Sequence, residues 1–306
     1  LFFVLGVLAT LVKSDLEIPA ASAKFISLYL LFSIGFKGGQ ELVHSGLNEE
    51  ILYSLGLAVL LSVVIPLYVF FLLRKKLNVY DAGAVASAYG SVSAVTFISA
   101  ASFLEANQTP FGGHMVAAMA MMEAPAIVVG VILIRKFDTS GSQSGSLKKV
   151  IHEAFTNGSV WMILGSLVIG LIADSKQAEG IKPFTSDIFK GFLAIFLLEM
   201  GMVAAKRFKA FVQYGWFVSL VSLVLPVING CLAIFLSSLF HMEAGNRFML
   251  AILAASASYI AVPAAMRLAA PKADPGLYIP MALGITFPFN ITVGMPLYWM
   301  LVQQWP

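Results

Sequence analysis

The arrangement of apolar residues constrains this chain more than any other feature. They come in long blocks, each close to the ~20 residues that a helix needs to cross a bilayer. In lipid every backbone polar group must be paired within the protein, so a spanning segment is a helix or part of a closed barrel. Barrel strands alternate polar and apolar residues over about ten positions, whereas these blocks are uniformly apolar. We therefore expect an all-α membrane protein.

We predict about ten transmembrane helices. The composition agrees, because 59% of the residues are hydrophobic and 11% are charged, too few charges for the surface of a soluble domain. The chain opens within its first apolar block, so we expect that span to be incomplete. The predicted spans lie at about residues 1–12, 20–36, 50–73, 82–104, 112–134, 158–173, 188–204, 211–240, 247–269 and 276–302.

Basic residues predict the orientation, because they concentrate in cytoplasmic loops. With these spans, 14 Lys and Arg residues fall on one side of the membrane and 5 on the other. We assign the richer side to the cytoplasm, which puts both termini on the non-cytoplasmic side of the inner or plasma membrane. The Ser- and Gly-rich segment 138–149 lies on the richer side, and we interpret it as a flexible cytoplasmic linker.

The two halves of the chain resemble each other. Five apolar segments match in the same order, beginning with VLGVLATLV (4–12) and ILGSLVIGLI (163–172). Two of the matches pair prolines within the apolar blocks. These pairs are Pro66 with Pro226 and Pro125 with Pro288. Any one match is weak, but five in order predict an internal repeat.

We predict a first five-span repeat at residues 1–137 and a second at residues 150–306. Because five is an odd number of spans, the second copy is inverted in the membrane relative to the first. Inverted repeats are the architecture of many secondary transporters. We expect a gate domain from spans 1, 2, 6 and 7 and a core domain from spans 3–5 and 8–10.

The fourth and ninth predicted spans are unusually polar. Serines and a threonine crowd residues 82–104, and serines, a tyrosine and Pro263 occupy matching places in residues 247–269. Hydroxyl side chains compete with helical hydrogen bonds, and a proline removes a backbone donor. We therefore predict that both spans are interrupted. Interrupted helices in corresponding positions of two repeats indicate a binding site at the membrane midplane.

Such a site suits an anion together with Na⁺. The N-termini of half-helices present unpaired N–H groups and a positive dipole end to an anion. Freed carbonyls and hydroxyl oxygens suit a hard cation. The alternative for any single serine is close helix packing, for which small residues are also used.

Ionisable groups at membrane depth are the second class of candidate. Glu123 lies well inside its apolar block, and we predict that it couples transport to a cation, with a structural role as the alternative. Glu199 lies nearer a span end and either functions in transport or pairs with Lys37. Asn290 and Asn229 either line the site or tie helices together.

Several other classes of protein are disfavoured. No serine lies in a nucleophile-elbow sequence, and all four histidines lie near span ends or in loops, which argues against an intramembrane hydrolase. The single cysteine, Cys231, supports neither a disulfide nor a metal cluster. No basic stripe for nucleic acid is present. We expect no enzymatic activity and no cofactor.

Four segments carry a resemblance to a known family that spans nearly the whole chain. They are IGFKGGQEL (34–42), AYGSVSAVTFISAASFLE (88–105), MEAPAIV (122–128) and AASASYIAVPAAMRLAAPKADPGLYI (254–279). These segments are similar to those of the sodium-dependent bicarbonate transporter family, best known from cyanobacteria. The last is the most specific, because its serines, proline, arginine and final turn recur in order.

The resemblance implies Na⁺-coupled symport of bicarbonate or a related small anion by alternating access. By position it implies that Glu123 replaces a family aspartate and that Tyr259 stands where another aspartate is usual. It also implies a homotrimer and, for cyanobacterial members, a PII-like cytoplasmic regulator. Our alternative function is a cation/proton exchanger that uses Glu123. By position the resemblance implies that Ser91, Ser93, Thr96, Ser256 and Ser258 contact the anion or Na⁺. Taken with the residue patterns above, we predict an anion-binding set of Gly90, Ser91, Ser93, Thr96, Ser256, Ser258 and Tyr259, and a cation-binding set of Glu123, Ser91, Thr96 and Asn290.

Overall fold

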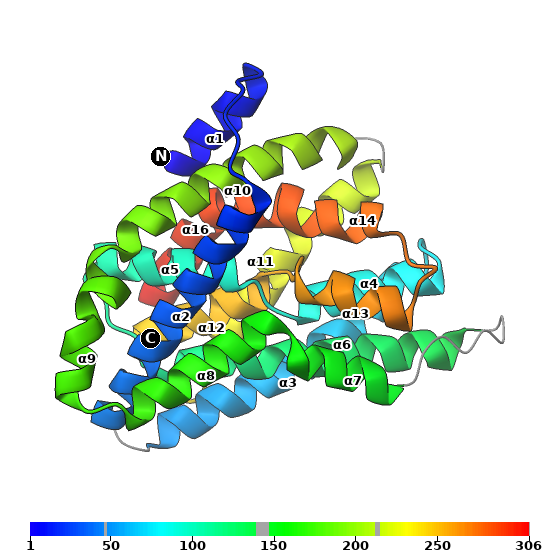
Figure 1. The fold of residues 1–306 in the computed structure, drawn as a ribbon. Coiled ribbons are helices and arrows are strands. Elements are labelled where there is room, and N and C mark those ends of the chain that lie inside the picture. The colour runs from blue at the N-terminus through cyan, green and yellow to red at the C-terminus, as the bar shows by residue number, and fades with distance from the viewer. Residues whose placement is uncertain (46–47, 139–146, 212–214, 306) are drawn as a thin grey trace.

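Every regular element that the computed structural model describes, in residues 1–45, 48–138, 147–211 and 215–305, is helical (Figure 1). Within these residues, seven helical segments are long and apolar enough to cross a membrane. Three shorter apolar helices, Phe2–Leu11, Gly158–Ile172 and Ala244–Ala255, accompany them. The chain is thus an all-α, multi-pass membrane protein. Each predicted block overlaps one of these helices, and the number of ten spans stays a prediction.

Within the described residues up to 138, the first half of the chain forms six helices. They are α1 (Phe2–Leu11), α2 (Ala20–Ser45), α3 (Glu49–Leu73), α4 (Val79–Gly90), α5 (Ala94–Ala106) and α6 (His114–Phe137). The predicted end of the second span at residue 36 is wrong, because α2 continues to Ser45. Its polar residues find partners on neighbouring helices. Lys37 lies over the ring of Phe189, and the Gln40 amide donates to carbonyl oxygens at the end of the Gly158–Ile172 helix.

The second half is more divided. Its elements are α7 (Leu147–Thr156), α8 (Gly158–Ile172), α9 (Ser175–Lys182), the π-helix η1 (Pro183–Asp187), α10 (Phe189–Phe211), α11 (Trp216–Ser238), α12 (Ala244–Ala255), α13 (Ala261–Ala269), and a last helical segment made of α14 (Pro275–Pro280), η3 (Met281–Thr286), α15 (Phe287–Phe289), η4 (Asn290–Gly294) and α16 (Met295–Gln304). The predicted block 211–240 corresponds to α11, which runs from Trp216 to Ser238. Most of the predicted linker, residues 139–146, lies outside the described residues.

Four helices pack as two close pairs, α1 with α10 and α2 with α8, and α10 also contacts α2. In Figure 1, α1 and α10 lie together at the top. Each crossing brings a glycine of one helix against a backbone carbonyl of the other. A Cβ on Gly39 of α2 would collide with the Leu167 carbonyl of α8, and a Cβ on Gly201 of α10 would collide with the Phe3 carbonyl of α1. Small residues therefore set both helix separations.

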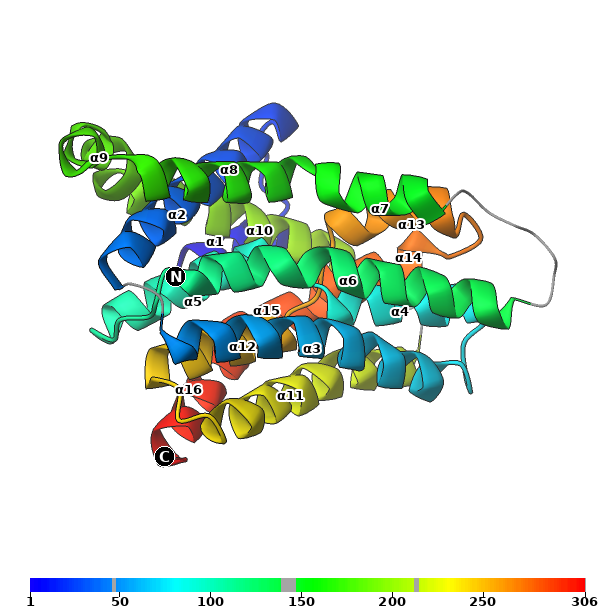
Figure 2. The ribbon, with the colours of Figure 1, turned by 90° about the horizontal axis from the view of Figure 1, so that it is seen from below.

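The remaining long helices form a second group. The helix α3 packs on α4 and α6, and α11 packs on α12 and on the last helical segment. Figure 2 shows α3, α6 and α11 aligned along one direction. Buried aromatic residues fill the interior of this group, including Tyr89, Phe97, Phe248 and Tyr298. The group surrounds the interrupted segments.

Both predicted interruptions are present. The helix α4 ends at Gly90, and α5 begins at Ala94. The helix α12 ends at Ala255, and α13 begins at Ala261. Polar side chains tie the outer ends of α4 and α12 to loops in the same way. A side-chain oxygen of Asp81 accepts from the Asp274 amide at 2.8 Å, and that of Asn246 accepts from the Gly112 amide at 2.7 Å.

Candidate substrate and ion site

The two interruptions meet inside the second helix group. The backbone N–H of Ser93, from the α4–α5 connection, donates to the hydroxyl of Ser256 at 2.9 Å. The backbone N–H of Ser258, from the α12–α13 connection, donates to the carbonyl of Ala88 at 2.8 Å. We call this meeting of residues 91–93 and 256–260 the crossing. The predicted cooperation of the two interruptions in one site therefore has a direct structural basis.

Serines at matching positions produce the two interruptions. Ser91 and Ser256 follow the last residues of α4 and α12, and both have extended backbones. Ser93 then begins α5, because its hydroxyl accepts from the Thr96 amide at 3.2 Å. The Ser256 hydroxyl instead donates back to the Leu253 carbonyl at 2.8 Å. These side chains replace backbone hydrogen bonds that the interrupted helices lose.

Two helices begin at the crossing with exposed dipole ends. In α5, the Ser93 hydroxyl caps one first-turn amide. In α13 the preceding residue is Ile260, which provides no side-chain cap. The first amides of a helix have no partner within the helix, and they carry its partial positive charge. The crossing thus offers backbone donors to an anion.

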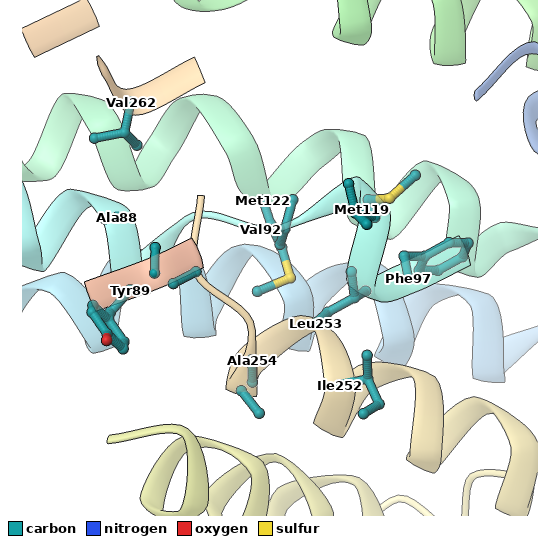
Figure 3. Packing of buried hydrophobic residues seen from close by; sticks show 14 of the residues in the cluster. Ala88, Tyr89, Val92, Phe97, Met119, Met122, Ile252, Leu253, Ala254 and Val262 are labelled. Atoms are coloured by element: carbon teal, nitrogen blue, oxygen red, sulfur yellow. The ribbon is translucent and has the colours of Figure 1, made fainter. Parts of the chain in front are cut away.

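A small cavity lies at the crossing, with about 20 Å³ of space for a water-sized solute. A space of that size can hold a water molecule or a small ion. Figure 3 shows apolar side chains around the crossing, among them Val92, Met119 of α6 and Leu253 of α12. The cavity is lined by Val92, Ser93, Ala94, Met119, Glu123, Ser159, Ile163, Ser258, Tyr259 and Ile260.

Glu123 brings a carboxyl group to this cavity from the middle of α6. Its side chain is 8% exposed, and no hydrogen bond or ion pair joins it to another residue in the described part of the chain. A buried carboxylate without a partner is costly unless it is neutralised. Glu123 is therefore placed to accept a cation or a proton.

The remaining predicted site residues do not line the cavity. Gly90 packs against the ring of Pro66. Thr96 is buried and has its amide capped within α5. Asn290 donates to the Ala255 carbonyl at 2.8 Å, which satisfies the last carbonyl of α12. Of the two serines that end α4 and α12, Ser256 bridges the interruptions, while the Ser91 hydroxyl is buried without a hydrogen bond to any described residue.

The structure also bears on two sequence interpretations outside the crossing, those of Asn229 and Glu199. Asn229 accepts from the Tyr68 hydroxyl, so it ties α11 to α3. The suggested pairing of Glu199 with Lys37 is absent, because Lys37 lies over Phe189 instead.

His114, one of the histidines near a predicted span end, is buried and lies 3.1 Å from the Ser54 hydroxyl. A polar partner on α3 explains why this side chain is tolerated inside the protein.

The sequence reasoning missed two polar features near the site. Ser159, in the first turn of α8, lines the cavity from the other helix group. No pattern in the sequence singles it out, since it only follows Asn157, the cap of that helix, by two residues. The second feature is a buried bridge, in which the Tyr89 hydroxyl lies 2.6 Å from the Thr286 hydroxyl. Thr286 in turn donates to the Ser222 carbonyl, so the bridge joins α4, the last segment and α11.

A comparison with known families agrees with this geometry. None of the curated proteins compared with the chain matches it. The family model of the Na⁺-dependent bicarbonate transporter superfamily matches residues 1–303. The match includes both interruptions, Glu123 and the whole of the cavity lining. The chain therefore belongs to the Na⁺-dependent bicarbonate transporter superfamily.

Proposed function

We propose that this protein is a Na⁺-coupled symporter of bicarbonate that works by alternating access in the inner or plasma membrane. The observation that carries the proposal is the small cavity at the crossing. In one small space it combines two helix N-termini, the hydroxyls of Ser93 and Ser258, and the carboxyl group of Glu123. Family membership supports the identity of the ion and the anion.

In this proposal the anion binds between the N-termini of α5 and α13. Backbone amides stabilise its negative charge, and the side chains of Ser93 and Ser258 supply further donors. Tyr259 stands at the edge of the same cavity, where a phenolic hydroxyl donates without adding a negative charge. An aspartate at this position would repel the anion, so Tyr259 favours anion binding.

Glu123 provides the coupling to the cation. An anion and an ionised carboxylate in one small cavity repel each other, and a bound Na⁺ removes that repulsion. The Glu123 carboxylate supplies the kind of oxygen ligand that a hard cation prefers. Binding of either solute therefore raises the affinity for the other.

Two sets of contacts support an inverted repeat. In α1 and α10, Gly6 faces the Leu198 carbonyl while Gly201 faces the Phe3 carbonyl. The pair α8 and α2 repeats this arrangement with the same three-residue spacing. There, Gly170 faces the Phe36 carbonyl while Gly39 faces the Leu167 carbonyl. In this arrangement α1 of the first half corresponds to α8 of the second, and α2 corresponds to α10. Replacing each helix by its counterpart therefore turns the pair α1–α10 into the pair α8–α2.

The second set consists of the ties at the outer ends of α4 and α12. Asp81 lies nine residues before the end of α4, and Asn246 lies nine residues before the end of α12. Each side chain accepts from a backbone amide in the loop that follows the second half of the other repeat's interrupted span. We propose that α1, α2, α8 and α10 form the gate domain and that the other long helices form the core domain.

A larger cavity supports a conformation that opens to one side. This vestibule has about 760 Å³ of space and shares Ser159, Tyr259 and Ile260 with the small cavity. Its lining also includes Lys24 near the start of α2 and Asn157 at the start of α8. The distribution of basic residues places these helix starts on the cytoplasmic side. We infer an inward-open state, with both termini on the opposite side of the membrane.

Uptake by proteoliposomes tests this function. We expect purified protein to accumulate radiolabelled bicarbonate under an inward Na⁺ gradient and to stop when choline replaces Na⁺. A Na⁺-driven change of luminal pH without bicarbonate would instead support the cation/proton exchanger. The homotrimer and the PII-like regulator stay predictions of the family resemblance.

A further inference from the structure

Glu199 is a second carboxylate on the transport path that the function above does not use. It lies on α10 and lines the vestibule. Its Oε2 atom is buried and has no hydrogen bond to any residue in the described ranges. An unpartnered carboxylate oxygen at membrane depth is costly for a purely structural residue.

The vestibule around Glu199 supplies oxygen atoms that suit a cation. Ser27, Asn157, Ser159 and Tyr259 line the same space. Lys24 is the basic side chain in this lining, and it is exposed. No ion pair joins it to Glu199 among the described residues. The carboxyl group therefore faces a space that a hydrated or partly hydrated cation can reach.

The vestibule also leads directly to Glu123. Ser159, Tyr259 and Ile260 line both cavities, so a solute that leaves the small cavity past Tyr259 arrives beside Glu199. The Tyr259 hydroxyl lies 3.8 Å from the sulfur of Met200, the residue after Glu199. Glu123 and Glu199 lie on helices with different main partners, because α6 packs most extensively on α3 and α4 while α10 packs most extensively on α1.

We propose that Glu199 forms a second Na⁺ position in the vestibule, which holds the cation after it leaves Glu123. This inference rests on the proposed function for the identity of the cation. Because the two carboxylates belong to different helix groups, a relative movement of the groups separates the positions. After this movement Glu199 of the gate domain holds the cation, and Glu123 of the core domain no longer does.

Binding of radioactive Na⁺ to the detergent-purified full chain tests the inference without requiring transport. We expect the unmodified protein to bind Na⁺ at two positions. In Glu199→Gln the Na⁺ affinity of one of these positions should fall at least tenfold, so that this position is lost. The matched control is Glu179→Gln, which removes an exposed carboxylate from α9 and should keep both positions. Unchanged Na⁺ stoichiometry and affinity in Glu199→Gln would overturn the inference.

A second variant covers a failure of Glu199→Gln to fold, which gel filtration detects. Glu199→Asp keeps the charge but withdraws it by one methylene, so we expect both positions to remain with a severalfold weaker affinity at one. Binding identical to that of the unmodified protein would contradict the proposal. Loss of one position in a protein that takes up no bicarbonate would support the Na⁺ position and refute the symport function instead.

Discussion

Replacement of Glu123 by Gln tests how Na⁺ and the anion are coupled. The change removes a charge from the small cavity and keeps the size of the side chain. Two unit charges about 5 Å apart, at an effective dielectric constant of about 20, repel each other by about 3 kcal/mol. A repulsion of about 3 kcal/mol corresponds to roughly 100-fold in affinity. Bicarbonate should therefore bind the unmodified protein roughly 100-fold more tightly with Na⁺ than without it.

In Glu123→Gln the repulsion is absent whether or not Na⁺ is present. The bicarbonate dissociation constants in Na⁺ and in choline should then differ by less than about fivefold, and uptake should no longer follow the Na⁺ gradient. Isothermal titration calorimetry of the purified protein measures both constants. Linkage supplies an internal check, because bicarbonate must raise the Na⁺ affinity of the unmodified protein by the same factor.

The matched control is Glu105→Gln. Its carboxylate forms an ion pair with Lys190 at 2.8 Å, and both side chains are largely exposed, at 58% and 70%. Such surface pairs contribute little, so the Na⁺ effect should be that of the unmodified protein. If Glu123→Gln kept the full Na⁺ effect on bicarbonate affinity, Glu123 would have no part in coupling.

Three further predictions concern the crossing and the helix pairs. Ser93→Ala and Ser258→Ala should each raise the KM for bicarbonate in uptake assays. Only Ser93→Ala should also lower the free energy of unfolding, by about 1 kcal/mol, because it removes a helix cap. Equal losses of stability in the two variants would contradict this difference. Asn290→Ala should cost about 1–3 kcal/mol in thermal unfolding, because it leaves the last carbonyl of α12 unpaired, and an unchanged unfolding temperature would remove this role. Gly39→Ala should cost about 1–3 kcal/mol through its collision with the backbone of α8, while Gly165→Ala, which has open space around it, should stay within about 0.5 kcal/mol of the unmodified protein. Equal effects of the two glycine changes would refute the close approach of α2 and α8.

The interruptions and the buried position of Glu123 were predictable because their signals are local. Serines at matching positions of two apolar blocks, with Pro263 in the second, favour breaks in both helices. A carboxylate in the middle of an apolar block also stands out in the sequence, as Glu123 does. Both signals need only the residue types and the bilayer as solvent.

The direction in which each side chain points was not predictable from such signals. Ser93 lines the cavity, whereas Thr96, one turn later in α5, is buried elsewhere. Asn290 pairs with a carbonyl 35 residues away in the chain, so its partner depends on tertiary packing. Ser159 reaches the cavity from a helix that has no interruption, and no local pattern marks it.

The alignment of the two halves was also uncertain in register. Letter matching places Gly6 opposite Gly165, in VLGVLATLV and ILGSLVIGLI. The packing gives Gly170 the role that Gly6 has, because these two glycines face carbonyls of a partner helix while Gly165 has open space around it. Apolar segments resemble one another too closely for residue types to settle such a shift.

A density map of the protein with bound Na⁺ and bicarbonate would test the central claim most directly. The proposal predicts an anion between the N-termini of α5 and α13, beside Ser93 and Ser258, and a cation beside Glu123. Density for the anion at any place remote from the crossing, with this cavity closed or filled by side chains, would contradict it.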